Sequence, residues 1–188
     1  DGTSLYTLVS FPDGYNTPLP VILTRSPYGE KSLRFFFEMS LFGYICVYQD
    51  CRGCYKSEGE WEPYIHEESD GLDTLNWIIS QTWCNKNIAM TGESYLSLAQ
   101  LVMAHRLPEE VKTLNIEVFS PYRYDLLYSD GMYHLEAYAG WTAYNVKSKF
   151  FDDKDKIYNM AITHKPQITL DKNIFGLELD WYKSWLLN

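Results

Sequence analysis

Short apolar runs alternate with helix-like apolar patterns through the first 120 residues of the chain. Buried strands are predicted at residues 20–24, 44–49, 88–91 and 113–119, and an outer strand at residues 5–11. Apolar side chains recur every three or four positions in three other segments, which predicts helices at residues 31–40, 70–80 and 94–106. This alternation predicts an α/β fold, a mostly parallel sheet flanked by helices.

Local signals set the expected ends of these elements. Gly43 is expected to stop the first helix. A polar, acid-rich loop at residues 58–68 precedes the second helix, for which Asp70 is the expected cap. From about residue 122 the chain becomes rich in aromatic side chains, and their pattern predicts helices. We therefore expect the N-terminal part of the core at residues 1–121 and a helical cap region at residues 122–188.

The segment Thr91-Gly92-Glu93-Ser94-Tyr95-Leu96-Ser97 follows a predicted strand and opens a predicted helix. A strand, a tight Gly-x-Ser turn and a helix in that order form a nucleophile elbow, which exposes the serine hydroxyl above the sheet edge. Ser94 is therefore the candidate nucleophile, and the backbone N–H of Tyr95 would face the oxyanion. The alternative is a serine in an ordinary strand-to-helix turn, because Leu96 replaces the final glycine of the usual Gly-x-Ser-x-Gly pattern.

Composition narrows the classes of partner. The chain has 188 residues, 46% of them hydrophobic, and a net charge of −9, which opposes binding to nucleic acids and to anionic membrane surfaces. No apolar run approaches the roughly 18 residues of a membrane span. Four cysteines are too few for a dense disulfide framework, so reduced thiols and a cytoplasmic location are expected. The sequence does not decide whether the protein is exported or whether it forms a homo-oligomer.

The segment Cys51-Arg52-Gly53-Cys54 has the CxxC spacing of thiol redox and zinc sites. A redox motif should open a helix, whereas this segment leads into a polar loop. A zinc site would need a second ligand pair at suitable spacing, and the sequence has none. We expect no metal and no cofactor, and keep a redox or zinc module as an alternative.

Several further motifs run in order from residue 1 to about residue 125. They are Asp1-Gly2, Arg25-Ser26-Pro27-Tyr28, Gln49-Asp50-Cys51-Arg52-Gly53, Ser57-Glu58-Gly59-Glu60-Trp61, Asp70-Gly71-Leu72-Asp73-Thr74, Trp77-Ile78-Ile79-Ser80-Gln81-Thr82-Trp83-Cys84 and Gly92-Glu93-Ser94-Tyr95-Leu96. With these motifs the chain resembles the cocaine esterase / X-Pro dipeptidyl peptidase family of α/β-hydrolases, which includes the α-amino-acid ester hydrolases.

The resemblance assigns roles to residues. It implies that the Tyr28 phenol and the Tyr95 backbone N–H form an oxyanion hole, and that Arg52 is a buried or half-buried ion-pair partner. The family motif is closer to Gly-x-Ser-Tyr-x-Gly, which accounts for Leu96. Ser97 stands where the family usually has the second glycine, and we expect this departure to cause a mild local adjustment.

A serine hydrolase also needs a histidine base and an orienting carboxylate. His105 ends the helix that begins at Ser94, about 16 Å from the elbow, and His134 and His164 fall in the predicted cap. The resemblance implies that the triad Asp and His follow the cap. We therefore expect neither in this chain, which would be an N-terminal fragment with an incomplete core and no enzymic turnover of p-nitrophenyl acetate by itself.

The cap region supplies candidate substrate contacts. The aromatic side chains expected to line an acyl pocket are Tyr128, Tyr133, Tyr138 and Trp141. By resemblance, Asp130 and Glu136 lie where α-amino-acid ester hydrolases place carboxylates that hold the substrate ammonium, so Asp130 and Trp141 are candidate substrate-binding residues.

The resemblance implies a serine hydrolase that cleaves small-molecule esters, amides or short peptides through an acyl-enzyme on Ser94. An X-Pro dipeptidyl peptidase is the alternative within the class. The alternative from another class is a non-catalytic binding member with a decayed site.

Overall fold

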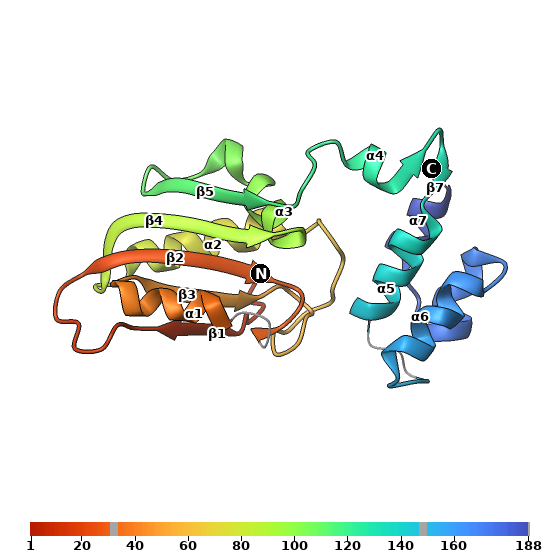
Figure 1. The fold of residues 1–188 in the computed structure, drawn as a ribbon, viewed down its shortest axis with the longest axis horizontal. Helices are drawn as coiled ribbons and strands as arrows, with labels where there is room; N and C mark the ends of the chain where they lie inside the picture. Colours follow the sequence, from red (N-terminus) through yellow and green to blue (C-terminus); the bar gives the residue numbers. More distant parts are fainter. Residues whose placement is uncertain (31–33, 147–149, 188) are drawn as a thin grey trace. The chain divides into compact units, whose positions relative to one another are not determined.

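The computed structural model describes residues 1–30, 34–146 and 150–187. The chain divides into two compact units, Asp1–Phe119 and Ser120–Asn188 (Figure 1). Each unit has its own core and is described by itself.

The first unit is built on a five-stranded sheet in the order β1-β3-β2-β4-β5. Its strands are β1 Thr7–Ser10, β2 Leu19–Ser26, β3 Ile45–Asp50, β4 Cys84–Glu93 and β5 Val111–Glu117. Only the β1–β3 pairing is antiparallel, and the other three pairings are parallel. The predicted mostly parallel sheet is thus confirmed, and the arrowheads of β2, β3, β4 and β5 lie at one common edge (Figure 1).

Helical segments connect these strands. They are α1 Arg34–Glu38, η2 Met39–Phe42, α2 Glu67–Ser80, α3 Tyr95–Leu101 and η3 Ala104–Arg106. The start of the helix predicted at residues 31–40 lies outside the described residues. Gly43 ends η2 with a left-handed φ of 89°, as expected. The predicted continuous helix at residues 94–106 is wrong in its second half, because α3 ends at Leu101 and a short 3-10 turn follows.

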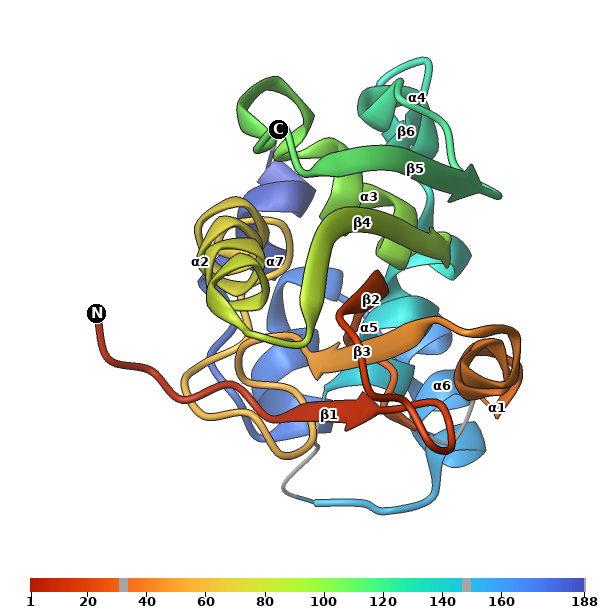
Figure 2. The ribbon, with the colours of Figure 1, turned by 90° about the vertical axis from the view of Figure 1, so that its left-hand side faces the viewer.

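Successive side chains along the central strands point to opposite faces of the sheet and pack into two hydrophobic cores. Val21, Leu23, Ile45 and Val47 pack with α2 residues such as Leu75 and Ile78 on one face. The strand residues between them, Cys46 and Tyr48, pack with Phe36 of α1 on the other face. Figure 2 shows α1 and α2 on opposite sides of the strands. Full burial of each such aliphatic side chain stabilises the fold by roughly 1.5–3 kcal/mol.

The start of α2 differs from its prediction. Asp70 is not the cap, because α2 begins at Glu67 and His66 occupies the cap position without a side-chain cap bond. The Asp70 carboxylate instead accepts two hydrogen bonds from Arg52, at 3.0 Å from Nε and 2.6 Å from the terminal nitrogen. A buried carboxylate near a helix N-terminus gains more from a guanidinium partner than from a solvated cap. The expected ion-pair role of Arg52 is confirmed.

The second unit combines helices with one β-hairpin. Its elements are α4 Arg123–Leu127, β6 Tyr128–Ser129, β7 Met132–Tyr133, η4 Glu136–Gly140, α5 Trp141–Asn145, α6 Lys154–Thr163, η5 Gln167–Thr169, η6 Asp171–Phe175 and α7 Asp180–Leu187. The hairpin corrects the expectation of helices throughout residues 122–151. It forms because Asp130 and Gly131 both adopt positive φ, 50° and 80°, which a two-residue hairpin turn requires.

Aromatic rings fill much of the core of the second unit. Ring centroids lie 5.7 Å apart for Tyr138 and Trp185, and 4.7 Å apart for Trp181 and Trp185. Such pairs add about 0.5–1.5 kcal/mol each to the energy of burial. In the described ranges, no helix is both long enough and apolar enough to span a membrane.

Candidate active site

Ser94 lies between the last residue of β4 and the first residue of α3. Its backbone has φ 54° and ψ −120°, and the residue is exposed at the carboxyl edge of the parallel strands. A non-glycine residue in this conformation carries strain of about 1–3 kcal/mol, and such strain concentrates at functional sites. The backbone at Ser94 therefore has the geometry of a nucleophile elbow.

Close packing explains the glycine two residues before Ser94. A Cβ on Gly92 would lie 2.3 Å from the Cβ of Leu96, and its φ of +153° also disfavours other residues. Leu96 is buried against this glycine. A leucine at the fifth position of the motif is therefore part of the packing that makes the sharp turn.

Hydrogen bonds hold the elbow against the neighbouring strand. The Ser94 N–H donates to the Glu117 carbonyl at the end of β5, with a donor–acceptor distance of 3.0 Å. The Ser94 carbonyl accepts from the amides of Ser97 and Leu98, at 3.1 Å and 3.2 Å. The residue is thus fixed at both its amide and its carbonyl, whereas its side chain is left at the surface.

The two residues expected to form the oxyanion hole lie together. Tyr28 follows β2 and is half-buried, and its ring lies edge-on to the Tyr95 ring at 6.5 Å between centroids. The Tyr28 amide donates to the Ser26 hydroxyl at 3.0 Å, which shapes the turn after the strand. Gly29 continues this turn with φ 81°, and a Cβ there would lie 2.6 Å from the Tyr55 ring.

The Tyr95 side chain is anchored in a buried polar contact that the sequence did not reveal. Its hydroxyl donates to the Glu67 carboxylate and accepts from the Tyr64 amide at 3.0 Å. Burial raises the pKa of the Glu67 carboxyl and raises that of the Tyr95 phenol well above its usual value. In the sequence, Glu67 is one acid among several in a polar loop, and no local signal separates it from its neighbours.

A buried arginine lies beside this contact. Arg25 is 2% exposed, its Nε donates to Gln49 at 2.8 Å, and a terminal nitrogen donates to the Glu67 carbonyl at 2.8 Å. The same guanidinium lies 4.0 Å from the Asp70 carboxylate. Its positive charge lowers the pKa of Glu67, but by less than burial raises it. Arg25 thus connects β2 to the start of α2 through the Glu67 carbonyl.

Each described histidine downstream of Ser94 contacts a group of its own unit. His105 lies 3.6 Å from the Glu68 carboxylate. His134 is hydrogen-bonded to the Ser129 hydroxyl at 2.6 Å and to the Leu126 carbonyl at 3.1 Å. His164 is hydrogen-bonded to the Thr169 hydroxyl at 2.9 Å. These contacts assign none of the three as the base for Ser94.

The four cysteines are all free and buried. Burial raises the pKa of the Cys51 thiol to about 12, so it stays protonated at neutral pH and is a weak nucleophile and ligand. Across the described residues, no group of three His, Cys, Asp or Glu side chains is arranged to hold a metal ion. The burial of Cys51 and Cys54 and the raised pKa of the Cys51 thiol therefore disfavour a reactive redox pair at this turn.

The candidate substrate residues of the second unit lie in three different settings. Asp130 is exposed at the turn of the β6–β7 hairpin. Glu136 is exposed and accepts a hydrogen bond from the Tyr158 hydroxyl at 3.0 Å. Trp141 is half-buried and belongs to the aromatic core, with its ring 6.4 Å from those of Tyr138 and Trp185. Their role in substrate binding stays a prediction.

Comparison with known proteins identifies the family of the chain. The family model described as X-Pro dipeptidyl-peptidase (S15 family) matches residues 1–185. Cocaine esterase from Rhodococcus sp. (strain MB1 Bresler) is 35% identical over 152 residues, which cover 76% of this chain and 26% of that protein. The chain thus spans about a quarter of the length of this relative.

Solved structures also match the fold of this chain. An aminopeptidase from the marine sediment archaeon Thaumarchaeota archaeon matches with a TM-score of 0.61 and 26% identity, over 77% of this chain and 28% of that one. An α-amino acid ester hydrolase matches over the same shares with a TM-score of 0.63, and its 22% identity bears on the fold alone. From the match of the family model over residues 1–185, we conclude that this chain belongs to the X-Pro dipeptidyl-peptidase (S15) family.

Proposed function

We propose that the whole protein is a serine hydrolase that cleaves carboxylic esters or amides through an acyl-enzyme on Ser94. The observation that carries the proposal is the strained, exposed backbone of Ser94 at the junction of β4 and α3. An ordinary serine at a helix start would adopt a relaxed extended conformation and bond to the helix amides. Ser94 makes no such side-chain cap bond.

In this mechanism, Ser94 and the groups beside it have distinct roles. The Ser94 Oγ attacks the substrate carbonyl, its proton passes to a histidine base, and the carbonyl electrons move onto the oxygen. The Tyr28 hydroxyl and the Tyr95 N–H donate hydrogen bonds to this oxyanion. Two aimed donors contribute several kcal/mol of transition-state stabilisation. The tetrahedral intermediate then collapses, the leaving group takes the proton, and water hydrolyses the acyl-enzyme.

The substrate class is drawn from the relatives. One similar protein is a cocaine esterase and another is an aminopeptidase, which together support esters and amides or short peptides as substrates. The family description supports an X-Pro dipeptidyl peptidase as the second candidate. Asp130 and Trp141 remain our candidates for substrate contacts, with the Asp130 carboxylate suited to a free α-amine.

A fluorophosphonate probe tests the nucleophile. We expect the whole protein to be labelled at a single serine, which peptide mass spectrometry identifies as Ser94, and the Ser94→Ala variant to be unlabelled. The Tyr28→Phe variant should be labelled but turn over p-nitrophenyl acetate about 100-fold more slowly, because it lacks one oxyanion donor. Absence of labelling in the folded whole protein would instead favour the non-catalytic binding member.

Activity is proposed for the whole protein because the chain spans about a quarter of its relative's length. We expect residues 1–188 alone to show no enzymic turnover of p-nitrophenyl acetate. We also propose a cytoplasmic location, which the four free thiols support.

A further inference from the structure

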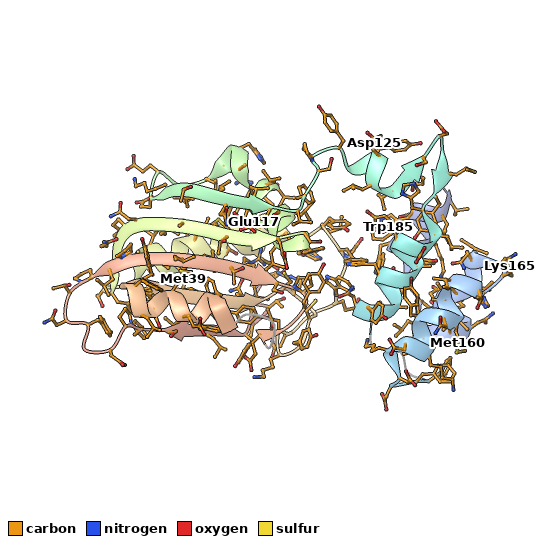
Figure 3. The ribbon with its side chains drawn as sticks, viewed as in Figure 1. Met39, Glu117, Asp125, Met160, Lys165 and Trp185 are labelled. Carbon is orange, nitrogen blue, oxygen red and sulfur yellow. The ribbon has the colours of Figure 1, made fainter. Side chains whose placement is uncertain are left out.

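Ser97 is fully buried in the first turn of α3, and its hydroxyl contacts three backbone groups. The Ser97 Oγ lies 2.6 Å from the Gly92 carbonyl oxygen and 2.8 Å from the Glu117 carbonyl oxygen. It also accepts a hydrogen bond from the Glu117 N–H at 2.9 Å. Glu117, labelled in Figure 3, is the last residue of β5. One hydroxyl therefore links β4, α3 and β5 at the elbow.

Glu117 is also the residue that holds Ser94. Its carbonyl accepts the Ser94 N–H at 3.0 Å, so the peptide groups of one residue bind both Ser94 and Ser97. Gly92 and Ser97 lie on either side of Ser94 along the chain, and the Ser97 hydroxyl joins them. The turn that carries Ser94 is thus closed into a hydrogen-bonded ring that is anchored on β5.

Such a ring matters because the Ser94 backbone is strained, with φ 54° and ψ −120°. A strained conformation persists only where several contacts together impose it. A glycine or alanine at position 97 would leave the Glu117 N–H without this acceptor and the Gly92 carbonyl without this donor. Small displacements of a nucleophile or an oxyanion donor lower catalytic rates steeply.

We propose that Ser97 is a positioning residue, whose hydroxyl fixes Ser94 and the Tyr95 amide in their reactive arrangement. This inference rests on the proposed function of Ser94 as the nucleophile. The mild adjustment expected at this position stays a prediction, and the structure adds that the hydroxyl makes a bridge that a glycine cannot make.

The test compares variants of the whole protein with p-nitrophenyl acetate as the substrate. We expect Ser97→Ala to lower kcat about tenfold while KM stays within about twofold, because the change affects the reacting groups and not the binding of substrate. Ser57→Ala is the matched control. The Ser57 hydroxyl also bridges two backbone groups, donating to the Asp50 carbonyl at 2.8 Å and accepting from the Tyr6 N–H at 2.9 Å.

Kinetics are measured at a temperature at which circular dichroism shows all variants folded. A Ser97→Ala kcat within twofold of the wild type, or a loss no greater than that of Ser57→Ala, would overturn the proposal. If Ser97→Ala does not fold, Ser97→Gly is judged by the same criterion, because it also removes the hydroxyl and leaves the chain able to relax around the vacant site.

Hydrogen exchange separates this proposal from the proposed function. We expect Ser97→Ala to speed amide exchange about tenfold in the peptide that carries Ser94, with no change in peptides from α2. Faster exchange without any labelling of wild-type Ser94 would reject the nucleophile and keep the bridge. Unchanged exchange in that peptide would reject the bridge, whatever the activity.

Discussion

The Tyr95 hydroxyl donates a hydrogen bond to the carboxylate of Glu67, and both side chains are buried. This contact joins the first residue of α3 to the first residue of α2. Because Tyr95 directly follows Ser94, the contact also sets the position of the proposed oxyanion amide. The second Glu67 carboxylate oxygen is buried with no hydrogen-bond partner among the described residues. The charged form of Glu67 is therefore poorly stabilised in the folded chain.

Glu67 makes the stability of the chain depend on pH. Its pKa is raised on folding, so the folded state binds a proton more tightly than the unfolded state. The stabilisation it contributes is fully present below its unfolded pKa, about 4.3, and is lost as the pH rises through the folded pKa. We expect the free energy of unfolding of the wild type, relative to Glu67→Gln, to fall with rising pH above that value.

Urea denaturation at a series of pH values measures this difference. Glu109→Gln, a change at an exposed acid, serves as the control for the loss of one carboxylate. A difference between wild type and Glu67→Gln that rises with pH would contradict the raised pKa.

Backbone strain at Ser94 can be measured through glycine. We expect Ser94→Gly to be more stable than Ser94→Ala by about 1–2 kcal/mol, because glycine adopts φ 54° without a Cβ penalty. At Ser57, which is outside the positive-φ positions of the described chain, the same pair of substitutions should show the opposite order. Equal stabilities of the two Ser94 variants in urea would argue against the strain.

Arg52 and Asp70 form a two-pronged ion pair that lysine cannot reproduce. Their side chains are 13% and 5% exposed. We expect Arg52→Lys to destabilise the fold by about 1–3 kcal/mol, because an ammonium group cannot make two parallel hydrogen bonds to one carboxylate. Asp1→Asn removes the charge of a second acidic partner of Arg52, which is 61% exposed, and should change the unfolding free energy by less than about 0.5 kcal/mol. Thermal or urea unfolding measures both changes, and an equal loss of stability in the two variants would contradict the prediction.

The cysteines should be inert in the folded chain. With a pKa of about 12, the Cys51 thiol at pH 8 is ionised to roughly one part in ten thousand. We expect iodoacetamide to leave the four buried thiols unmodified until denaturant is added, as followed by mass spectrometry. Rapid alkylation of Cys51 or Cys54 under native conditions would revive the redox alternative.

The sequence predicted the first unit well because its central strands are short apolar runs buried on both faces, and its helices bury one apolar face. The continuous apolar run Val21, Ile22 and Leu23 places side chains in two cores on opposite faces of the sheet, and a run of this kind is recognisable in the sequence. The predictions were wrong at helix ends, because the pattern of apolar residues does not show where a helix begins or ends. The prediction began α2 after Asp70, whereas the helix begins at Glu67. The Asp70 carboxylate is not a cap because it binds Arg52, 18 positions away in the chain.

The second unit was predicted less well. Asp130-Gly131 is a hairpin signal, but the aromatic pattern around it favoured helices, and positive φ at both turn residues decided the local structure. An aromatic-rich pattern indicates that the side chains are buried. It does not distinguish a helix from a hairpin, because either can bury them in an aromatic core.

By itself, the sequence determined the parallel sheet and the Gly-x-Ser turn that Tyr95 follows at its carboxyl edge, because these depend on local periodicity and on short motifs. The resemblance to a known family added Tyr28. Only the tertiary structure decided that Glu67 anchors Tyr95 and that the Ser97 hydroxyl ties the elbow to Glu117. These partners lie 28 and 20 positions apart in the chain, and no local pattern records which buried polar groups must satisfy one another's hydrogen bonds once the chain folds.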